Sequence, residues 1–566
     1  MSDKQAMQKL IGLFTGYKCI ISIIIANLMF SASLNFCIPL ISRRIMDDGF
    51  ISGNLNLITK LAIVSFLIYL LIISLNIVTE KLRIDLSAKI QYNLNEESFK
   101  HLMRVDVSYY DKRNYTEMFS NLNMDISNMT LIADQGVFFV FTQIFSIIGG
   151  TIGLFILDYR MTFIILFIIP IKYIMMKLFA KKRKEIMDSF IRENSNYARW
   201  FGDTVGGVRE ARLLGLTARK QSEFSIKQKT VIREYKRLNM LSQMNIGVDS
   251  VMVQIMVLII YIVGANLVFN MGLTIGTVFA FITYSSYVTG PISAILNIKY
   301  LLSGIIPSTK RYYKFISAPE EDENDNIDIP EWKKISFNNV SFSYIDGSQV
   351  IKDVELTIEK GEKIALVGKN GCGKSTLVDL LLRLRIPQEG IISLDGIDIS
   401  DFSLTSYREM FAVVSQDIYL FNDSIRNNIC LYRDINEDVL IKVCEESGML
   451  EFINEVSLDY IVGTNGKMLS GGQKQKIALA RALLLDRPIL ILDEATANAD
   501  VVSELQINLL LHTSLNDKTV IVISHREQIL YSLDRVILID DGRIIDKGKF
   551  SDISRKDPYL SLMDNV

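Results

Sequence analysis

Residues 363–377 read Lys-Ile-Ala-Leu-Val-Gly-Lys-Asn-Gly-Cys-Gly-Lys-Ser-Thr-Leu. The apolar run that leads into Gly368 predicts a buried strand, and Gly373-Lys374-Ser375 follows it at the spacing of a phosphate-binding P-loop. Glycines at these positions let successive backbone N–H groups turn onto phosphate oxygens, and the following helix points its positive end at the same anion. The stretch therefore predicts a nucleotide site in which Lys374 contacts the β- and γ-phosphates and the Ser375 hydroxyl binds Mg²⁺.

The chain has 566 residues, of which 49% are hydrophobic and 22% are charged. So high an apolar content excludes a disordered chain, and 5 cysteines in this length exclude a disulfide-stapled scaffold. The formal net charge of -2 gives no reason to expect nucleic acid as a partner. A largely apolar chain with ordinary charge content predicts that one part lies in lipid and another in water.

The apolar residues are concentrated in the first half of the chain. Charge-free runs occupy residues 19–42, 61–79, 135–157 and 250–298, and a further apolar run at 161–176 contains Lys172. A helix needs about 20 apolar residues to cross a bilayer, so 250–298 holds two spans with a turn at Asn270-Met271-Gly272. The pattern predicts six transmembrane helices, because buried helices of a soluble protein fit so many charge-free runs poorly.

Lysine and arginine set the predicted orientation of these spans. Lys4, Lys9 and Lys18 precede the first span, and residues 177–237 after the fourth span are strongly basic. The first run is also too long for a signal peptide, whose apolar core is about 7–15 residues. We therefore expect a multi-pass protein of the cell inner (cytoplasmic) membrane with both termini in the cytoplasm.

Lys172 is the charged residue that interrupts the fourth span. It would lie near mid-bilayer if that span enters at Met161, about 16 Å away along the helix. A charge there costs at least about 2.5–3.5 kcal/mol on insertion scales. The lysine therefore either faces a wet cavity, where it would attract acidic groups of a transported molecule, or pairs internally or reaches the interface. Asp249 and Lys299 flank the long apolar stretch and are expected at the inner interface.

A change of composition marks the end of the membrane part. Residues 319–330 are acidic and bracketed by prolines, which is typical of a linker. Beyond them, short β-rich runs alternate with helical stretches, which predicts an α/β domain. The expected strands are residues 335–344, 350–358, 363–367, 411–414, 489–493, 519–523 and 536–540. We therefore expect an all-α transmembrane domain at 1–318 with helical extensions into the cytoplasm, an acidic linker at 319–334 and an α/β P-loop domain at 335–566.

A second carboxylate motif follows the P-loop. Residues 489–494 read Ile-Leu-Ile-Leu-Asp-Glu. An apolar strand that ends in a carboxylate suits a water-mediated hold of Asp493 on Mg²⁺, and Glu494 is then placed to polarise an attacking water. Taken alone, the two carboxylates would fit a solvated strand end better.

Leu469-Ser470-Gly471-Gly472-Gln473 lies between the P-loop and Asp493, and with it the chain resembles the ATP-binding cassette (ABC) family. In that family this pentapeptide is a signature that serves the γ-phosphate held by the partner chain. The resemblance also makes Gln416 the Q-loop glutamine, Asp500 the D-loop aspartate, His525 the switch histidine and Tyr344 the aromatic residue that stacks on adenine.

The resemblance implies a full set of site residues. The implied catalytic residues are Glu494, His525 and Gln416, and the implied Mg²⁺ ligands are Ser375, Gln416 and Asp493. The implied ATP contacts are Tyr344, Gly368, Asn370, Gly371, Gly373, Lys374, Ser375, Thr376, Ser470, Gly471, Gly472, Gln473 and Asp500.

Six spans before a single cassette resemble the exporter branch of this family, in which one chain is half a transporter. Residues 109–113 and 206–210 resemble its coupling segments, and residues 420–429 resemble the stretch that meets them. The D-loop at 497–500 reads Ala-Asn-Ala-Asp, where a Ser-Ala-Leu-Asp type is usual. The implied fold is a membrane protein with an all-α six-helix transmembrane domain and an α/β P-loop ABC ATPase domain.

The resemblance implies a dimer in which two ATP molecules join two cassettes. We expect a second half-transporter as partner, a homodimer in preference to a heterodimer, together with membrane lipid, a transported substrate and no nucleic acid. The expected function is ATP-driven export of a hydrophobic or amphipathic peptide, lipid or drug by alternating access. The alternative is a membrane-bound ATPase subunit that acts as a sensor or immunity partner. Accumulation of substrate in inside-out vesicles would separate the two.

Overall fold

The structure, a computed structural model of the whole chain, describes residues 1–110, 115–321, 329, 331–344, 347–493, 501–524 and 526–554. Within these ranges the side chains of residues 115–117, 134–135, 137, 271, 293–301, 303 and 501–504 are not described. The chain forms two compact units, Met1–Arg104 with Arg113–Ala318 and Val105–Lys112 with Pro319–Val566. A short segment between two helices of the first unit thus belongs to the second unit, where Val105 pairs with Glu320 and the Asp106 N–H donates to the Pro319 carbonyl at 3.1 Å.

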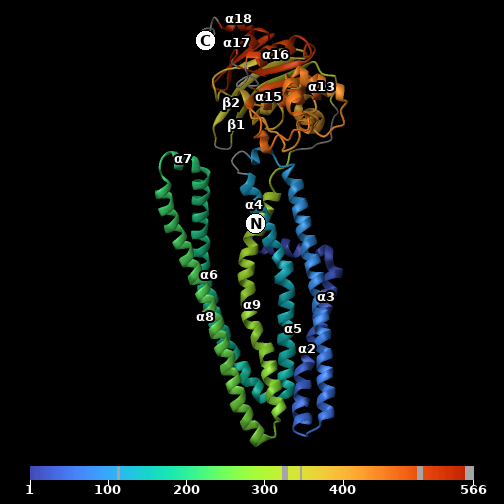
Figure 1. Cartoon of the computed structure of the whole chain (residues 1–566), viewed down its shortest axis with the longest axis vertical. Helices are drawn as coiled ribbons and strands as arrows, with labels where there is room; N and C mark the ends of the chain where they lie inside the picture. The colour runs from blue at the N-terminus through green and yellow to red at the C-terminus, as the bar shows by residue number, and fades with distance from the viewer. Residues whose placement is uncertain are drawn as a thin grey trace. The chain divides into compact units, whose positions relative to one another are not determined.

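The first unit is built from helices (Figure 1). Their bounds are α1 Asp3–Gly12, α2 Lys18–Arg44, α3 Leu55–Leu102, α4 Tyr115–Leu131, α5 Val137–Leu157, α6 Tyr159–Gly206, α7 Val208–Leu213, α8 Thr217–Met271 and α9 Ile275–Ile316. Helices α6 and α8 run side by side, while α2 packs against α3, α5 and α9. The unit therefore consists of a long helix pair and a group of neighbouring helices.

The predicted spans fall on α2, α3, α5, α6, α8 and α9. Within the described residues, the first five of these are long and apolar enough to cross a membrane. Helix α9 is the sixth long helix, with 42 residues, and part of its side chains lie outside the described set. Helices α3, α6 and α8 have 48, 48 and 55 residues, so each continues well beyond the length of one span, about 20 residues.

The turn between α8 and α9 lies where the sequence predicts it. Gly272 ends α8 in the left-handed conformation at φ 73°. Glycine adopts this conformation without strain because it has no Cβ atom. Asp47, beyond the end of α2, holds the start of α9 through the Thr274 hydroxyl at 2.6 Å and the Gly276 N–H at 2.8 Å. A Cβ on Gly276 would lie 2.5 Å from the Arg43 carbonyl oxygen, so only glycine permits this close approach.

Lys172 on α6 is an internally paired lysine. Its side chain is 2% exposed, and its Nζ lies 2.8 Å from Asp249 Oδ1 on α8. Of the two interpretations of the sequence, the structure supports internal pairing over an open charge in a wet cavity. The expectation that Asp249 only marks the inner interface is incomplete, because its carboxylate neutralises the lysine on the neighbouring helix.

The second unit contains two sheets. The strands are β1 Lys334–Ser343, β2 Gln349–Glu359, β3 Lys363–Val367, β4 Glu389–Leu394, β5 Ile397–Asp398, β6 Phe411–Val414, β7 Ile489–Asp493, β8 Thr519–Ile523, β9 Arg535–Asp540 and β10 Arg543–Gly548. One sheet is antiparallel, in the order β2-β1-β4-β5. The other has the order β10-β9-β3-β8-β7-β6 and is parallel except for β10.

Helices surround the parallel sheet and confirm the α/β class. Their bounds are α10 Lys374–Leu381, α11 Leu404–Arg408, α12 Ile425–Cys430, α13 Glu437–Glu446, α14 Leu450–Val456, α15 Gly471–Leu485, α16 Val501–His512, α17 Glu527–Tyr531 and α18 Phe550–Ile553. Every residue of β7 and β8 is buried, as expected for strands covered on both faces. A separate core forms between α12, α13 and α15 around Leu420, Leu440 and Ile477.

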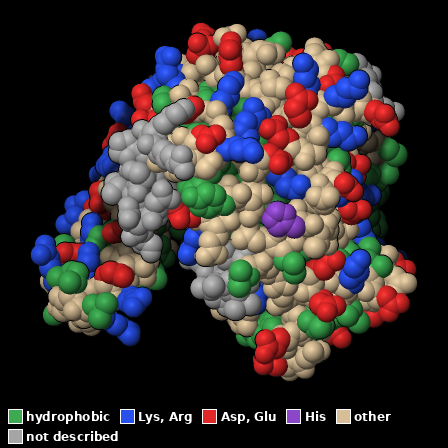
Figure 2. Space-filling model, turned by 90° about the horizontal axis from the view of Figure 1, so that it is seen from above, with side chains coloured by type: hydrophobic (Ala, Val, Ile, Leu, Met, Phe, Trp, Pro, Cys, Tyr) green, Lys and Arg blue, Asp and Glu red, His purple; other side chains and the backbone are tan. Residues whose placement is uncertain are grey.

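The surface of one face of the molecule is mixed in charge. Figure 2 shows Lys and Arg side chains interspersed with Asp and Glu among the coloured residues, with small hydrophobic groups between them. Interspersed charges of both signs are typical of a surface that faces water.

Candidate functional site

The P-loop lies between β3 and α10, as the sequence predicts. Gly368 follows the strand at φ 154°, and a Cβ there would lie 2.0 Å from the Ile539 carbonyl oxygen of β9. Gly373 precedes the helix at φ 109°, and its Cβ would lie 2.7 Å from Ile351 Cδ1 of β2. The positive φ at both positions, together with the strand carbonyl beside Gly368, therefore requires glycine, and the loop is wound tightly at the start of α10.

Lys374 closes this loop with its own side chain. It is buried, and its ammonium donates to the carbonyl oxygens of Gly368 at 2.7 Å and Lys369 at 3.0 Å. An ammonium group has three protons and a flexible stem, so it can exchange loop carbonyls for phosphate oxygens. Ser375 is exposed on the first turn of α10, beside the loop.

Tyr344, which directly follows β1, contacts the same helix. Its hydroxyl is 3.1 Å from Thr376 Oγ1 on α10. The guanidinium of Arg385 lies 4.7 Å from the centre of its ring, which is a cation–π distance. Arg385 also forms an ion pair with Asp379 at 3.2 Å. Arg385 was not predicted from the sequence, since no motif marks a residue that acts through contact with an aromatic ring 41 positions away in the chain.

Parallel pairing brings two more predicted residues, Asp493 and Gln416, to the sheet edge that holds the P-loop. Leu366 of β3 and Asp493 of β7 both pair with Ile523 of β8, and Val414 of β6 pairs with Leu492 of β7. The carboxyl ends of these strands therefore share an edge, which is where open α/β sheets bind ligands. The P-loop, the buried Asp493 carboxylate and the exposed Gln416 all follow strands at that edge.

Three of the predicted site residues, Glu494, Asp500 and His525, lie outside the described residues. In the sequence, Glu494 directly follows β7 and His525 comes two positions after β8. Their proposed roles therefore rest on sequence position and on the resemblance.

The donor set fits the magnesium ion that the family implies. A serine hydroxyl at 375 and a carboxylate at 493 supply the hard oxygen ligands that Mg²⁺ prefers. Among the described residues there is no group of three or more His, Cys, Asp or Glu side chains that could hold a metal. Mg²⁺ is usually bound through one or two carboxylates together with substrate phosphates.

The signature segment forms the start of α15. The Ser470 hydroxyl accepts from the Gln473 N–H at 3.2 Å, and the Gln473 amide oxygen accepts from the Ser470 N–H at 2.8 Å. This reciprocal capping box uses both side chains within the segment. The first-turn N–H groups of Gly471 and Gly472 have no helical partner, so they are the donors available to an anion.

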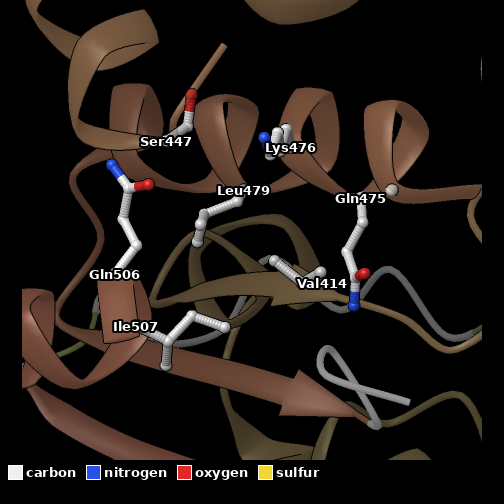
Figure 3. Close-up of a pocket in the computed structure, with 8 residues that line it drawn as sticks. Val414, Ser447, Gln475, Lys476, Leu479, Gln506 and Ile507 are labelled. Carbon is white, nitrogen blue, oxygen red and sulfur yellow. The ribbon is translucent and has the colours of Figure 1, made fainter. Parts of the chain in front are cut away.

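A small pocket lies between α15, β6 and α16 (Figure 3). Its volume is about 20 Å³, which is room for about one water molecule and not for a nucleotide. Gln506 of α16 lies at its edge and donates to the carbonyl oxygens of Glu445 and Glu446 at 3.1 Å each. These bonds fasten the C-terminal end of α13 to α16, a connection for which the sequence contains no motif.

Cys372 within the P-loop is a buried thiol. Burial raises its pKa above the usual range, although the nearby Lys374 ammonium opposes this shift. The thiol therefore stays protonated at neutral pH and is unreactive there.

Comparison with known families matches both parts of the chain. The family model for the ABC transporter transmembrane region matches residues 21–292, and the ABC transporter model matches residues 351–497. The chain belongs to the ABC transporter family. It joins one transmembrane region to one ATPase domain, as in exporter-type half-transporters, and is thus an ATP-hydrolysing, multi-pass membrane protein.

Relatives are similar to this transporter along both parts. The ATP-dependent lipid A-core flippase of Pseudoalteromonas translucida is 28% identical over 97% of this chain and 95% of its own. The protein of the same name from Alcanivorax borkumensis is 28% identical over 84% of this chain and 82% of its own. A bacterial Atm1-family ABC exporter with ATP bound has the same fold, with a TM-score of 0.83 at 20% identity over 96% of this chain and 98% of its own.

Proposed function

We propose that this ABC transporter exports an amphipathic, lipid-like molecule across the inner membrane. The observation that carries the proposal is the similarity to lipid A-core flippases over both parts of the chain at once. Long charge-free helices suit a substrate with an apolar portion. That portion can stay against apolar side chains while the substrate moves from one leaflet of the bilayer to the other. In this proposal both termini lie in the cytoplasm, where the ATPase domain meets ATP; the lysines that precede the first span support this orientation.

The residues at the edge of the parallel sheet receive the following roles. Lys374 and the P-loop N–H groups bind the β- and γ-phosphates, and Tyr344 stacks on adenine. Ser375, Asp493 and Gln416 would hold Mg²⁺, which when bound supplies positive charge against the phosphate oxygens. Glu494 takes a proton from the attacking water, and His525 contacts the γ-phosphate.

The signature supplies the reason for a dimer. The N–H groups at the start of α15 are proposed to bind the γ-phosphate of an ATP molecule that is held by the P-loop of a partner chain. Asp500 is proposed to contact the same ATP. Two chains, preferably identical, then enclose two ATP molecules. ATP shifts the population toward a closed dimer that opens outward, because the closed state binds ATP better. Hydrolysis resets it.

Reconstitution in liposomes tests this function. Wild-type protein with MgATP should move a fluorescent lipid between leaflets, measured as the change in fluorescence accessible to a membrane-impermeant quencher. Glu494→Gln should retain ATP binding but lose roughly 100-fold or more of phosphate release, since it lacks the base. Lys374→Ala should lose ATP binding. Phosphate release that is equal in wild type and Glu494→Gln would refute the base, and ATPase activity without lipid movement would favour the sensor or immunity role.

A further inference from the structure

A cavity in the first unit is lined by polar side chains from charge-free helices. Its volume is about 240 Å³, and it lies between α2, α3, α5 and α9. On α5, Thr142, Ser146 and Gly149 face it at the spacing of one helix face, and on α2 Ser31 and Asn35 do so one turn apart. Ser31, Asn35, Asn76, Thr142 and Ser146 thus place polar side chains around one space.

Hydrogen bonds within the protein satisfy only part of this polar lining. The Ser31 hydroxyl lies 3.4 Å from Asn76 Oδ1 on α3, and the Asn35 amide donates to the Ser31 carbonyl at 3.0 Å. In the described part of the chain, Asn76 Nδ2 and Ser146 Oγ make no hydrogen bond to protein. Helix association alone would use such groups between helices. Here two of them remain directed at a cavity, which points to a ligand.

The lining specifies the chemistry of that ligand. It contains no Asp, Glu, Lys or Arg. A charged ligand would therefore lose its hydration without gaining an opposite charge, which costs much free energy inside a membrane. Amides and hydroxyls both donate and accept, as do the hydroxyls of a sugar or glycerol. The rings of Phe36, Phe145 and Tyr287 border the same space and offer flat apolar surface.

The size of the cavity and its surroundings indicate the shape of the ligand. Pockets for drug-sized ligands have about 300–1,000 Å³, so this cavity takes one headgroup and not a whole amphiphile. Asn76 and Thr142 are exposed, so the cavity is open at the surface. Ile77 of α3 and Ile148 of α5, 65% and 51% exposed, extend apolar surface from the same helices for a hydrocarbon tail.

We infer that this cavity binds the uncharged, hydroxyl-bearing headgroup of a lipid, such as a sugar or glycerol. The inference rests on the proposed function, whose substrate class it narrows from amphipathic lipids to those with a neutral polyhydroxyl headgroup. Asn76 and Ser146 are the specificity-determining residues, since each has a polar atom without a protein partner.

Photolabelling of the full chain tests this site without nucleotide. The probe is an alkyl glucoside with a diazirine on the sugar, added to protein in phosphatidylcholine nanodiscs, and the labelled peptides are mapped by mass spectrometry. Label should appear on residues 28–36 and 142–150. Excess unlabelled alkyl glucoside should compete, whereas an alkyl sulfate or alkylphosphocholine of equal tail length should not.

Variants test whether labelling depends on the side chains of Asn76 and Ser146. Asn76→Leu and Ser146→Ala should each lower labelling roughly three- to tenfold, as expected for one lost hydrogen bond. Ser74→Leu is the matched control, because this exposed serine lies about 200° around α3 from Asn76 and bonds to its own helix at Leu70. Basal ATPase activity of each variant verifies the fold.

The outcomes separate this inference from the proposed function. Equal competition by the charged amphiphiles, or unchanged labelling in both cavity variants, would overturn the headgroup site even if wild-type protein moves lipid. Labelling that follows the expected pattern in a protein that moves no lipid would retain the site and refute the exporter.

Discussion

Tyr344 connects the adenine side of the proposed site with the P-loop. Thr376 holds its hydroxyl and Arg385 covers its ring, so the ring is fixed in position. Tyr344→Ala should remove about 1–3 kcal/mol of base stacking, which raises the KM for ATP roughly five- to hundredfold. The kcat should change less, because the ring does not touch the reacting atoms. Steady-state ATPase kinetics measure both.

Tyr344→Phe is the matched control for this prediction. It keeps the ring over which Arg385 lies and loses only the contact with Thr376, so its KM should stay within about threefold of wild type. An unchanged KM in the alanine variant would show that Tyr344 does not stack on the base.

Cys372 reports on how tightly the P-loop is closed. Because burial raises the pKa of this thiol, the reactive thiolate is scarce at neutral pH and increases only at alkaline pH. Maleimide labelling of Cys372 in the folded chain should therefore be slow near pH 7 and become faster as the pH is raised. Mass spectrometry of the P-loop peptide measures the rate, with the denatured chain as reference. Equal rates for folded and denatured chains near pH 7 would contradict a closed loop.

The predictability of the site differs from residue to residue. Lys374 was predicted from the spacing of the P-loop, Asp493 from its place at the end of an apolar strand and Gln416 from the family resemblance. Parallel pairing explains why these three distant segments meet, while the roles of the residues stay predictions. Arg385 and Gln506 have no such spacing. Each acts on a residue brought near by folding alone, so a single sequence contains no signal for them.

Helices α6 and α8 are joined by the Lys172–Asp249 pair. Lys172→Ala leaves a carboxylate without its cation between two apolar helices. Breaking a fully buried pair costs about 3–5 kcal/mol, and because the Asp249 side chain is 30% exposed we expect roughly 1–3 kcal/mol here. The thermal unfolding midpoint of the purified protein in detergent should fall accordingly.

A double-mutant cycle isolates this pair. Lys172→Ala with Asp249→Asn should be less destabilised than the sum of the two single variants, since neither charge is left alone. Lys177→Ala is the control, because this lysine is exposed on the same helix and should cost little. Additive effects of the two single variants would mean that the pair does not stabilise the helix contact.

Regular elements were predictable where the pattern is local. The expected strands at 363–367, 411–414, 489–493 and 519–523 coincide with β3, β6, β7 and β8, because each is a short apolar run with mostly buried side chains. Strand β4 was missed: it begins Glu389-Gly390, and its pairing with β1 bridges Ser341 and Glu389, far apart in sequence. Strand β10 alternates exposed and half-buried residues and forms through a hairpin with β9.

The division of the whole molecule was visible only in part. Charge-free runs and an acidic segment separate membrane and α/β parts along the sequence. They gave no sign that residues 105–112 belong to the second unit, because Val105 and Glu320 pair across more than two hundred positions. A domain boundary predicted from sequence groups each stretch with the residues next to it in the chain. In the folded chain, residues 105–112 instead belong to the unit formed by residues that follow more than two hundred positions later.

The shared nucleotide site is a property of two chains and can be trapped by cross-linking. Asn370 is exposed in the P-loop, and Ser470 is exposed at the start of α15. In the proposed dimer the P-loop of one chain faces the signature of its partner. A chain with Asn370→Cys and Ser470→Cys, its native cysteines replaced, should form a disulfide-linked dimer on a non-reducing gel. MgATP should increase this dimer, because nucleotide draws the two segments together, and each single-cysteine variant is the control. A double variant that yields no more dimer than the single variants, with or without MgATP, would contradict a site built from two chains. If each P-loop faced the signature of its own chain, the two cysteines would not meet between chains.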